Sequence, residues 1–405
     1  REPWRRTAAA AGLLAGGEPT PTVFEAMTAL AAHHGAVNLG QGSPDEDGPG
    51  WVRERAAEAV RTGRDRANQY APGLGLPVLR EAVAAHQKRH YALEVDPGRE
   101  VLVTTGATEG IAAALLGLVG PGDEVVAFEP FYDSYAAMTA LAGARFTAVP
   151  LRPPHFLPDP QALEEVLGPD TRVVVLNTPH NPTGVVPDPS LLARLVEVCA
   201  RHDVLILSDE VYEHLVYEGR HHPVAAVPGA WDRTLTVSSA GKSFSLTGWK
   251  VGWVTGPADL VAGVRAVKQF LTYSTGPAYQ RAIAEALTEG DAYLAEQRDR
   301  FRGTRDLLLA GLREAGLEPL VPAAGYFTVT DLSALGLSDA AAAVGMLAER
   351  AGLVGVPVSA LCTPPDAGGT GAGLGAWMRW AFCKPAATIE DAVRRFAALP
   401  SALAG

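Results

Sequence analysis

The chain has 405 residues, of which 47% are hydrophobic and 20% are charged, and this composition predicts a soluble globular protein long enough for two domains. Its formal net charge of −11 argues against a nucleic-acid-binding protein, because such proteins normally present a basic face. No apolar run approaches the roughly 20 residues of a membrane-spanning helix, which argues against an integral membrane protein. The 3 cysteines and 10 histidines show no metal-ligand spacing, so we expect no metal site and a cytoplasmic protein with reduced thiols.

Residues 1–50 are expected to form an N-terminal arm and part of a smaller domain. Arg5-Arg6 followed by residues 7–17 superficially resembles a secretion signal. The segment is rich in alanine and glycine rather than leucine, which favours a mobile arm.

Strand and helix patterns alternate within residues 51–290, which we assign to a large domain. Helical patterns cover residues 108–118, 134–142 and 190–202. The alternation predicts an α/β fold with a mostly parallel, seven-stranded sheet flanked by helices on both faces. Short β-branched runs mark its strands at residues 101–104, 124–128, 145–149, 172–176, 204–208, 234–238 and 251–255.

Residues 291–405 are predicted to form a smaller α+β domain. Long helical patterns dominate this part, with two short strand patterns at residues 325–330 and 377–382. Residues 362–375 are rich in proline and glycine and are predicted to form a mobile loop near the pocket. The expected helices cover residues 291–315, 339–351 and 389–399.

Lys242 is the first candidate catalytic residue. Only 5 of the 34 basic residues are lysines, and Lys242 lies among small and hydroxyl residues directly after a predicted strand. A neutral lysine amine can form a Schiff base with an aldehyde, whereas arginine cannot. A solvated surface lysine is the ordinary alternative, but the apolar strand before Lys242 argues against it.

Three further motifs accompany Lys242 in a fixed order. Residues 177–184 read Asn-Thr-Pro-His-Asn-Pro-Thr-Gly, residues 208–214 read Ser-Asp-Glu-Val-Tyr-Glu-His, and residues 378–384 read Met-Arg-Trp-Ala-Phe-Cys-Lys. Together they resemble the class I aminotransferases that use pyridoxal 5′-phosphate. Within that family the chain is most similar to the branch that contains kynurenine, glutamine, methionine and N-succinyldiaminopimelate aminotransferases. The resemblance runs from about Thr22 to Phe396.

The resemblance implies a role for each candidate catalytic residue. Lys242 would hold the cofactor aldehyde and then move the Cα proton of the substrate. Asp209 would keep the pyridine nitrogen protonated, although an aspartate after a strand is ordinarily a helix cap. Tyr212 and Asn181 would donate hydrogen bonds to the phenolic oxygen of the cofactor, and for Asn181 an ordinary turn residue is the alternative.

The phosphate of the cofactor needs anion-binding groups at a helix start. The run at residues 104–110 joins a predicted strand to a predicted helix, so backbone N–H groups there can meet a phosphate, although a plain capping turn is the alternative. Tyr132 matches the aromatic ring that stacks on the pyridine, or else it is a core aromatic residue. Tyr70 matches a tyrosine that reaches the phosphate of a neighbouring subunit, which implies a homodimer with shared active sites. The phosphate ligands implied within the chain are Gly106, Ala107, Thr108, Ser239 and Lys250.

The substrate side of the site is also implied by the resemblance. Arg379 would bind the α-carboxylate through its planar guanidinium group, and the neighbouring aromatic residues favour a partly buried position. Gly42 would let the backbone close over the same carboxylate. Phe24 would lie at the side-chain pocket, and Asn181 would face both cofactor and substrate. The implied reactants are an amino acid and a 2-oxo acid, converted in a ping-pong cycle.

Several positions differ from the usual family pattern. Ser43, Gly325 and Cys362 are smaller than the usual residues, and Tyr279 follows an altered segment. These differences predict a roomier or more polar pocket, and with it a bulky substrate such as a biosynthetic intermediate. The motifs leave open β-elimination from S-substituted cysteines and other reactions of the same cofactor, such as decarboxylation or oxidative deamination. A non-catalytic binding protein would require the loss of Lys242 or Asp209, and both are present.

Overall fold

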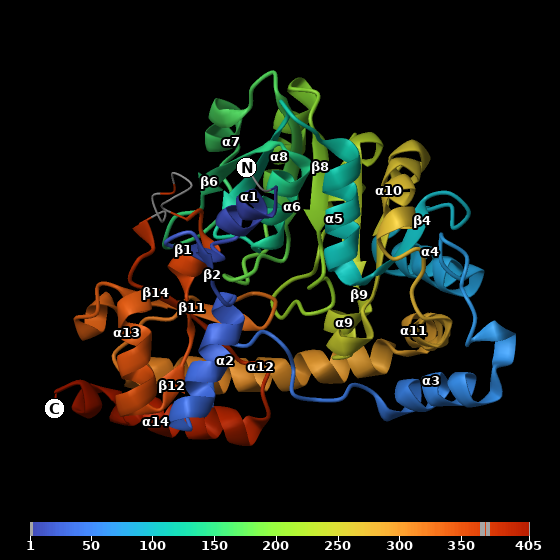
Figure 1. The fold of residues 1–405 in the computed structure, drawn as a ribbon. Helices are drawn as coiled ribbons and strands as arrows, with labels where there is room; N and C mark the ends of the chain where they lie inside the picture. The colour runs from blue at the N-terminus through green and yellow to red at the C-terminus, as the bar shows by residue number, and fades with distance from the viewer. Residues whose placement is uncertain (1–2, 365–368, 370–372, 405) are drawn as a thin grey trace.

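The structure is a computed structural model that describes residues 3–364, 369 and 373–404. It has a large part, built around a seven-stranded sheet, and a small part that lies beside the carboxyl ends of several of these strands (Figure 1). None of the helices in the described part of the chain combines the length and the apolar character that a bilayer-spanning helix requires.

The large sheet confirms the predicted mostly parallel architecture. Its strand order is β4-β10-β9-β8-β7-β5-β6, and only β10 runs antiparallel to its neighbours. Each predicted strand is present within one residue at either end. The strands are β4 (Val101–Thr105), β5 (Glu124–Glu129), β6 (Arg145–Pro150), β7 (Thr171–Asn177), β8 (Leu205–Asp209), β9 (Thr234–Ser239) and β10 (Val251–Thr255).

Helices cover both faces of this sheet. Val173 and Val175 of β7 pack against α5, α6 and α10, whereas Val174 and Leu176 pack against α7 and α8. Successive strand residues point to opposite faces, so a strand that is apolar at every position must be covered on both. The helices of the large part are α3 (Gly50–Thr62), α4 (Pro77–Tyr91), α5 (Gly106–Leu118), α6 (Ser134–Ala142), α7 (Pro160–Val166), α8 (Pro189–Arg201), α9 (Ala240–Ser243), α10 (Ala258–Leu271) and α11 (Pro277–Glu289).

The small part combines both ends of the chain. β3 pairs in parallel with β12, and Leu39 belongs to the same apolar core as helices α12 and α14, so the N-terminal segment joins the C-terminal one as predicted. A separate three-stranded sheet has the order β11-β14-β13. The elements are α2 (Val23–His34), β3 (Val37–Asn38), α12 (Asp291–Glu314), β11 (Phe327–Asp331), α13 (Ala340–Met346), β12 (Leu353–Val354), β13 (Val356–Pro357), β14 (Trp377–Ala381) and α14 (Ala386–Ala404).

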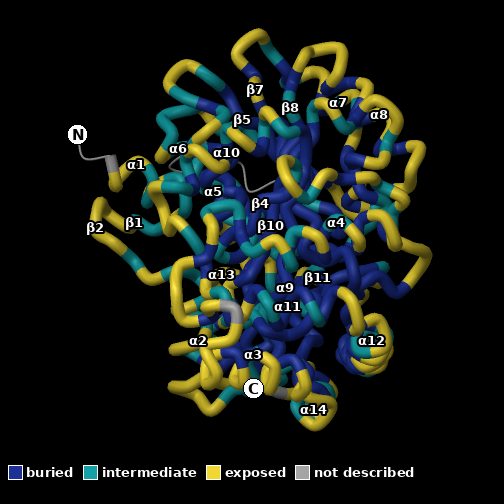
Figure 2. Tube along the Cα trace, turned by 90° about the vertical axis from the view of Figure 1, so that its right-hand side faces the viewer, coloured by how far each residue is buried: buried dark blue, intermediate teal, exposed yellow. Residues whose placement is uncertain are grey.

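Burial follows this arrangement. Figure 2 shows the strands of the large sheet as the buried centre, with exposed residues on the outer faces of helices such as α12 and α14. The helix predicted at residues 339–351 is present as α13 followed directly by a short π-helical segment, Leu347–Ala351.

The N-terminal arm differs from the prediction of a mobile segment. Helix α1 (Pro3–Ala10) packs against α6, and Ala10 contacts the apolar core beneath it, so this helix lies on the large part. A hairpin of β1 (Leu14–Ala15) and β2 (Glu18–Pro19) leads from there to α2. Half of the predicted loop at residues 362–375 lies outside the described residues. The exact domain boundaries stay a prediction.

Candidate active site

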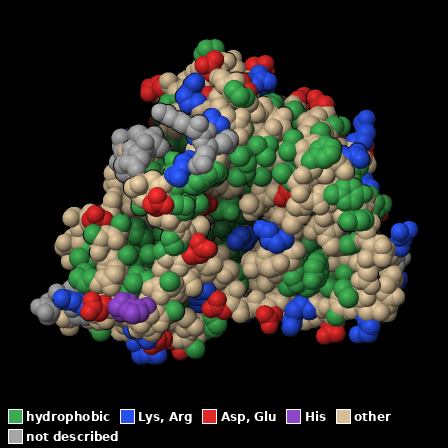
Figure 3. Space-filling view, viewed as in Figure 1, with side chains coloured by type: hydrophobic (Ala, Val, Ile, Leu, Met, Phe, Trp, Pro, Cys, Tyr) green, Lys and Arg blue, Asp and Glu red, His purple; other side chains and the backbone are tan. Residues whose placement is uncertain are grey.

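A cavity of about 280 Å³ lies between the large and the small part. Figure 3 shows a hollow at this boundary, with basic side chains at its edge. The sequence-predicted residues that line it are Phe24, Gly42, Gly106, Ala107, Thr108, Tyr132, Asn181, Asp209, Tyr212, Ser239, Lys242, Lys250 and Arg379. Tyr70, the remaining one, does not line the cavity of its own chain.

Lys242 enters the cavity from the short helix α9, which directly follows β9. Ser239 caps this helix by accepting a hydrogen bond from the Gly241 N–H at 3.2 Å. The Nζ of Lys242 donates to the Tyr326 hydroxyl at 2.9 Å and to the Gly42 carbonyl at 3.4 Å. Burial lowers the pKa of Lys242 from 10.5 to about 8. A larger share of the amine is therefore neutral near pH 7 than for an exposed lysine, and the neutral amine is the nucleophile.

Asp209 is the last residue of β8 and lies buried at the far side of the cavity. Burial raises the pKa of this carboxyl to about 6, although the Tyr135 hydroxyl donates to its Oδ2 at 2.5 Å and works in the opposite direction. Asp209 is not a helix cap here, because its main side-chain partner is a hydroxyl from α6. A carboxylate held this way can stabilise a positive charge placed beside it in the cavity.

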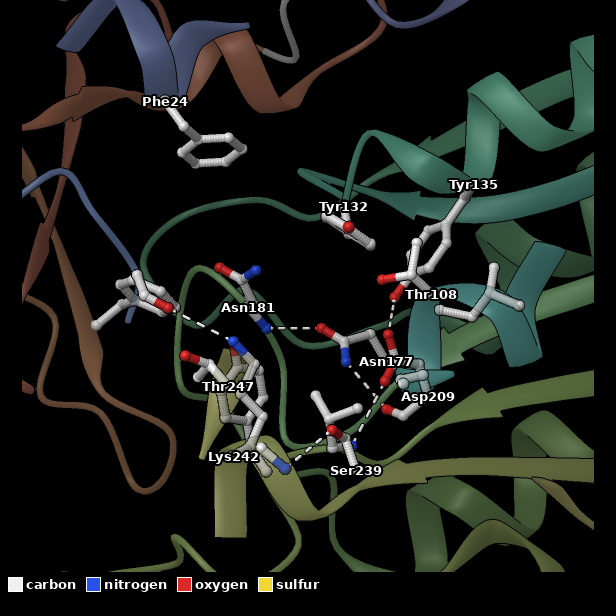
Figure 4. Close-up of a pocket in the computed structure, with 18 of the residues that line it drawn as sticks. Phe24, Thr108, Tyr132, Tyr135, Asn177, Asn181, Asp209, Ser239, Lys242 and Thr247 are labelled. Atoms are coloured by element: carbon white, nitrogen blue, oxygen red, sulfur yellow. Dashed lines mark hydrogen bonds between the residues drawn. The ribbon is translucent and has the colours of Figure 1, made fainter. Parts of the chain in front are cut away.

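A set of polar side chains lies around the middle of the cavity. The Asn177 amide donates to the Asp209 carbonyl at 2.9 Å, and its oxygen accepts from the Asn181 N–H at 2.7 Å. Burial raises the pKa of Tyr212, so its phenol stays protonated and can donate a hydrogen bond. Figure 4 shows Tyr132, Asn181 and Asp209 around the same space.

The start of α5 forms an anion-binding end of the cavity. Gly106 has a left-handed φ of 73°, and the Thr105 side chain makes no capping bond, so the first N–H groups of the helix have no side-chain cap. A Cβ at Gly106 would lie 3.1 Å from the Nζ of Lys250, which leaves little room for any side chain there. Helix N–H groups, an ammonium group and the nearby Ser239 make a donor set suited to a phosphate.

Arg379 is buried on the small-part side of the cavity, with a side chain that is 1% exposed. Its Nη2 donates to the Gly40 carbonyl at 2.7 Å and its Nη1 to the Asn181 Oδ1 at 3.2 Å, whereas its Nε has no partner. Burial lowers the pKa of Arg379 to about 10. Within the residues that the structure describes, no carboxylate forms an ion pair with it, so a buried cation without a counter-ion lines the cavity.

Aromatic rings and one glycine frame Arg379. The guanidinium carbon lies 4.0 Å from the Phe327 ring centre and 5.3 Å from that of Phe24. Phe24 is held in the first turn of α2 by a capping box between Thr22 and Glu25. A Cβ at Gly42 would approach the Phe327 ring to 2.5 Å, so only glycine fits there.

Several residues of the site were not predicted from the sequence. Tyr135 lies in α6, Phe327 begins β11 and Tyr326 directly precedes it. No local sequence pattern marks these aromatic residues as partners of Asp209, Lys242 and Arg379. Asn177 could have been found, because it is a polar residue at a strand end within a recognised motif.

The positions that differ from the family pattern do not enlarge this cavity. Ser43, Gly325, Tyr279 and Cys362 are all absent from its lining. Cys362 instead packs in the apolar core beside α7 and α8. These four positions therefore give no support within one chain for a roomier pocket.

Comparison with known proteins identifies the family. Residues 35–396 match the family model for aminotransferase class I and II. A probable N-succinyldiaminopimelate aminotransferase of Mycobacterium tuberculosis is 46% identical, over 93% of this chain and 96% of that protein. The methionine aminotransferase of Escherichia coli is 42% identical, over 85% of this chain and 89% of that protein.

Solved structures show the same fold. The N-succinyldiaminopimelate aminotransferase from Mycobacterium tuberculosis superposes with a TM-score of 0.89 over 94% of this chain and 97% of that one, at 46% identity. Aspartate aminotransferase from Thermus thermophilus with maleate superposes with a TM-score of 0.85, over 93% of this chain and 96% of that one, at 34% identity. The chain belongs to the class I and II aminotransferases. It is therefore an enzyme that transfers amino groups, and its family uses pyridoxal phosphate.

The residues of the cavity fit this cofactor. The start of α5 and Lys250 provide donors for a phosphate at one end, where Gly106 has a left-handed φ that favours glycine. The buried Asp209 carboxyl offers a partner for a ring nitrogen, and Lys242 offers an amine of lowered pKa for an aldehyde.

Proposed function

We propose that this chain binds pyridoxal phosphate in the cavity and moves an amino group from an L-amino acid to a 2-oxo acid in a ping-pong cycle. The single observation that carries the substrate assignment is Arg379, a buried cation whose Nε has no partner. A carboxylate is the group that a planar guanidinium binds best, and amino acids and 2-oxo acids share that group.

The proposed cofactor contacts divide between two ends of the cavity. When bound, pyridoxal phosphate supplies an aldehyde for the amine and a ring that accepts electron density from the substrate Cα. The N–H groups of Ala107 and Thr108, with Ser239 and Lys250, would hold the phosphate. Asp209 would hold the ring nitrogen in its protonated form, because a carboxylate in a buried setting favours a positive partner. Tyr132 would cover one face of the ring.

The proposed proton transfer belongs to Lys242. Once the substrate amine has taken its place on the cofactor, the free Nζ of Lys242 would take the proton from the substrate Cα. It would then deliver that proton to the cofactor carbon that carried the aldehyde. Burial keeps the pKa of this amine near 8, which suits a base that works close to neutral pH. The hydroxyl of Tyr326 at 2.9 Å orients the amine. Tyr212 and Asn181 would donate hydrogen bonds to the phenolic oxygen of the cofactor.

A homodimer with shared sites is part of the proposal. Tyr70 is 84% exposed in the single chain and Phe270 is 88% exposed, and the Tyr70 ring lies 5.4 Å from that of Tyr273. Large exposed aromatic residues close together are typical of a protein interface. Sedimentation of the holoenzyme as a monomer would contradict this part.

The domain division and the location are proposed as well. We assign residues 1–50 to the arm and part of the small domain, 51–290 to the large domain and 291–405 to the small domain. Cys199, Cys362 and Cys383 are free and buried, as expected of a protein in a reducing compartment such as the cytoplasm.

The proposed donor is a bulky biosynthetic intermediate. The support is the name of the 46% identical relative, since N-succinyldiaminopimelate is such a compound, and not the small residues that differ from the family pattern. The 42% identical methionine aminotransferase supplies the competing choice, a common amino acid. A comparison of kcat/KM for N-succinyldiaminopimelate and methionine would decide between them, and equal values would contradict the proposal.

The reaction itself is tested by its products. Holoenzyme mixed with an amino donor alone should form one equivalent of 2-oxo acid and of pyridoxamine phosphate, seen by absorbance and mass spectrometry. In a separate sample without amino donor, borohydride treatment should fix the cofactor to the peptide that contains Lys242. Pyruvate from S-substituted cysteines, without pyridoxamine phosphate, would indicate β-elimination instead.

A further inference from the structure

A second group of polar side chains lies behind the cavity, and we call it the back cluster: His86, Tyr91, Glu213, His214, Ser238 and Ser243. All but Tyr91 are buried according to their exposed surface. None of them lines the cavity. No sequence pattern predicts such a cluster, because its residues come from three separate segments.

The back cluster and the cavity wall share the same two segments. Residues 208–214 send Asp209 and Tyr212 to the cavity, whereas Glu213 and His214 belong to the back cluster. Residues 238–243 likewise send Ser239 and Lys242 to the cavity. In that segment the neighbours on either side, Ser238 and Ser243, face the back cluster.

Two hydrogen bonds join these segments to each other. Ser238 donates its hydroxyl to the Oε1 of Glu213, and the Nδ1 of His214 lies 2.7 Å from the Oγ of Ser243. Each bond therefore joins two residues that lie within two positions of a proposed cofactor contact.

Helix α4 holds the back cluster from the other side. The Tyr91 hydroxyl donates to the Oε2 of Glu213 at 2.6 Å, and the Nε2 atoms of His86 and His214 are 2.7 Å apart. Burial lowers the pKa of His86 to about 3 and also lowers that of His214, so both rings are neutral near pH 7. One neutral ring then donates to the other.

A metal ion is the alternative occupant, since His86, Glu213 and His214 have ligand atoms within 4.8 Å of one another. Two nitrogens bound to a tetrahedral zinc at 2.0–2.1 Å would be about 3.3 Å apart. The observed 2.7 Å is the distance of a direct hydrogen bond, and both oxygens of Glu213 already accept from hydroxyls. The geometry thus favours a hydrogen-bonded cluster.

The position of helix α9 needs such an external support. With residues Ala240–Ser243 it is a single turn, and an isolated turn of helix is unstable in water. Rotation of this turn would carry Lys242 and the Ser239 cap away from the cavity together. The His214 contact at Ser243 and the Glu213 contact at Ser238 fix the turn at both ends.

We propose that Glu213 and His214 are positioning residues, which clamp the segment of Asp209 and Tyr212 to the segment of Ser239 and Lys242 and so set the affinity for the cofactor. This inference rests on the proposed function. It predicts that the clamp matters for pyridoxal phosphate binding beyond its effect on overall stability.

The test compares two buried serines, of which Ser243 belongs to the clamp and Ser245 does not. Ser243→Ala removes the clamp bond to His214. Ser245→Ala is the control, because Ser245 is also buried and accepts a hydrogen bond from the Gln297 amide at 2.6 Å, but lies outside the clamp. Apoenzyme of each is titrated with pyridoxal phosphate and followed by visible absorbance, and its thermal midpoint is measured without cofactor.

We expect similar losses of thermal midpoint for both variants. The Kd for pyridoxal phosphate should rise by about five- to ten-fold in Ser243→Ala only, as expected for one lost buried hydrogen bond. Equal Kd values for the two variants would overturn the inference while leaving the proposed function intact. Wild-type protein that takes up no pyridoxal phosphate would overturn the proposed function, and this inference with it.

Substitution of His214 gives a second test. His214→Asn keeps a side-chain amide near the position of Nδ1 and should retain most of the cofactor affinity. His214→Leu keeps the bulk but loses the bond, and its Kd should rise at least as much as that of Ser243→Ala. Equal affinity of the Asn and Leu variants would contradict the clamp.

Discussion

The large-part wall and the small-part wall of the cavity hold their charged groups in different ways. On the large-part wall, Asp209 is bonded to Tyr135 from its own part, and the amine of Lys242 is bonded to Tyr326 across the cavity. On the small-part wall, Arg379 is buried with a free Nε and no carboxylate partner among the described residues.

This difference separates two tasks. The groups of the large-part wall follow the ends of neighbouring strands, where a sheet fixes them before any ligand arrives. On the small-part wall, the charge of Arg379 has no carboxylate partner among the described residues, so a bound anion can pair with it. We therefore expect changes on the first wall to lower the rate of reaction, and changes on the second to weaken substrate binding.

The largest effect is expected for Lys242→Ala. Loss of the amine that attacks the aldehyde and moves the proton should lower kcat by about 10⁴-fold. Steady-state turnover with the best amino donor measures it. Lys88→Ala is the control, since Lys88 is an exposed lysine paired with Glu94, and it should leave turnover unchanged. A kcat for Lys242→Ala within ten-fold of wild type would contradict the assignment.

Asp209→Asn should have the next largest effect. The change keeps the shape of the side chain but removes the negative charge beside the proposed ring nitrogen, and kcat should fall by about 10²–10³-fold. The KM for the amino donor should change little, because Asp209 lies on the wall away from Arg379. A variant with unchanged kcat and raised KM would reverse the comparison of the two walls.

Arg379→Lys should raise the KM for the amino donor by about 10–100-fold, with a smaller change in kcat. Lysine keeps the charge but cannot bind a carboxylate through two parallel hydrogen bonds, each worth about 1.5–3 kcal/mol when charged. The matched control is Arg305→Lys. Arg305 is also a buried arginine, and its guanidinium carbon lies 5.0 Å from the centre of the Tyr217 ring. It pairs with Glu218 outside the cavity. An equal rise in KM for both variants would indicate a general structural effect.

The smallest expected effect concerns stability and pH. The pKa of Lys242 is about 8 in the folded protein against 10.5 ordinarily. Below pH 8 the buried amine is charged, and this charge lowers the free energy of unfolding by its full amount. That cost disappears as pH rises from 8 to 10.5, because the folded protein loses the proton first. Lys242→Met should therefore raise the thermal midpoint of the cofactor-free protein at pH 7, by about 2 °C. The difference from wild type should shrink at pH 10, and a constant difference would show that the amine is not perturbed.

The sequence by itself determined the strands of the large sheet and the motifs at their ends. Asp209 and Lys242 follow β-branched runs, and residues after adjacent parallel strands must lie at the same edge of the sheet. The motif order also identified the family. Local patterns of this kind survive folding because they depend on neighbours in the chain.

Only the tertiary structure decided which side chains meet across the fold. Tyr135 reaches Asp209, Tyr326 reaches Lys242 and Phe327 covers Arg379, yet each looks like an ordinary aromatic core residue in the sequence. The same holds for the histidines, which show no spacing pattern but include a buried pair on α4 and after β8. These contacts join residues far apart in the chain, and their distances are set by how helices and sheets pack rather than by any local preference.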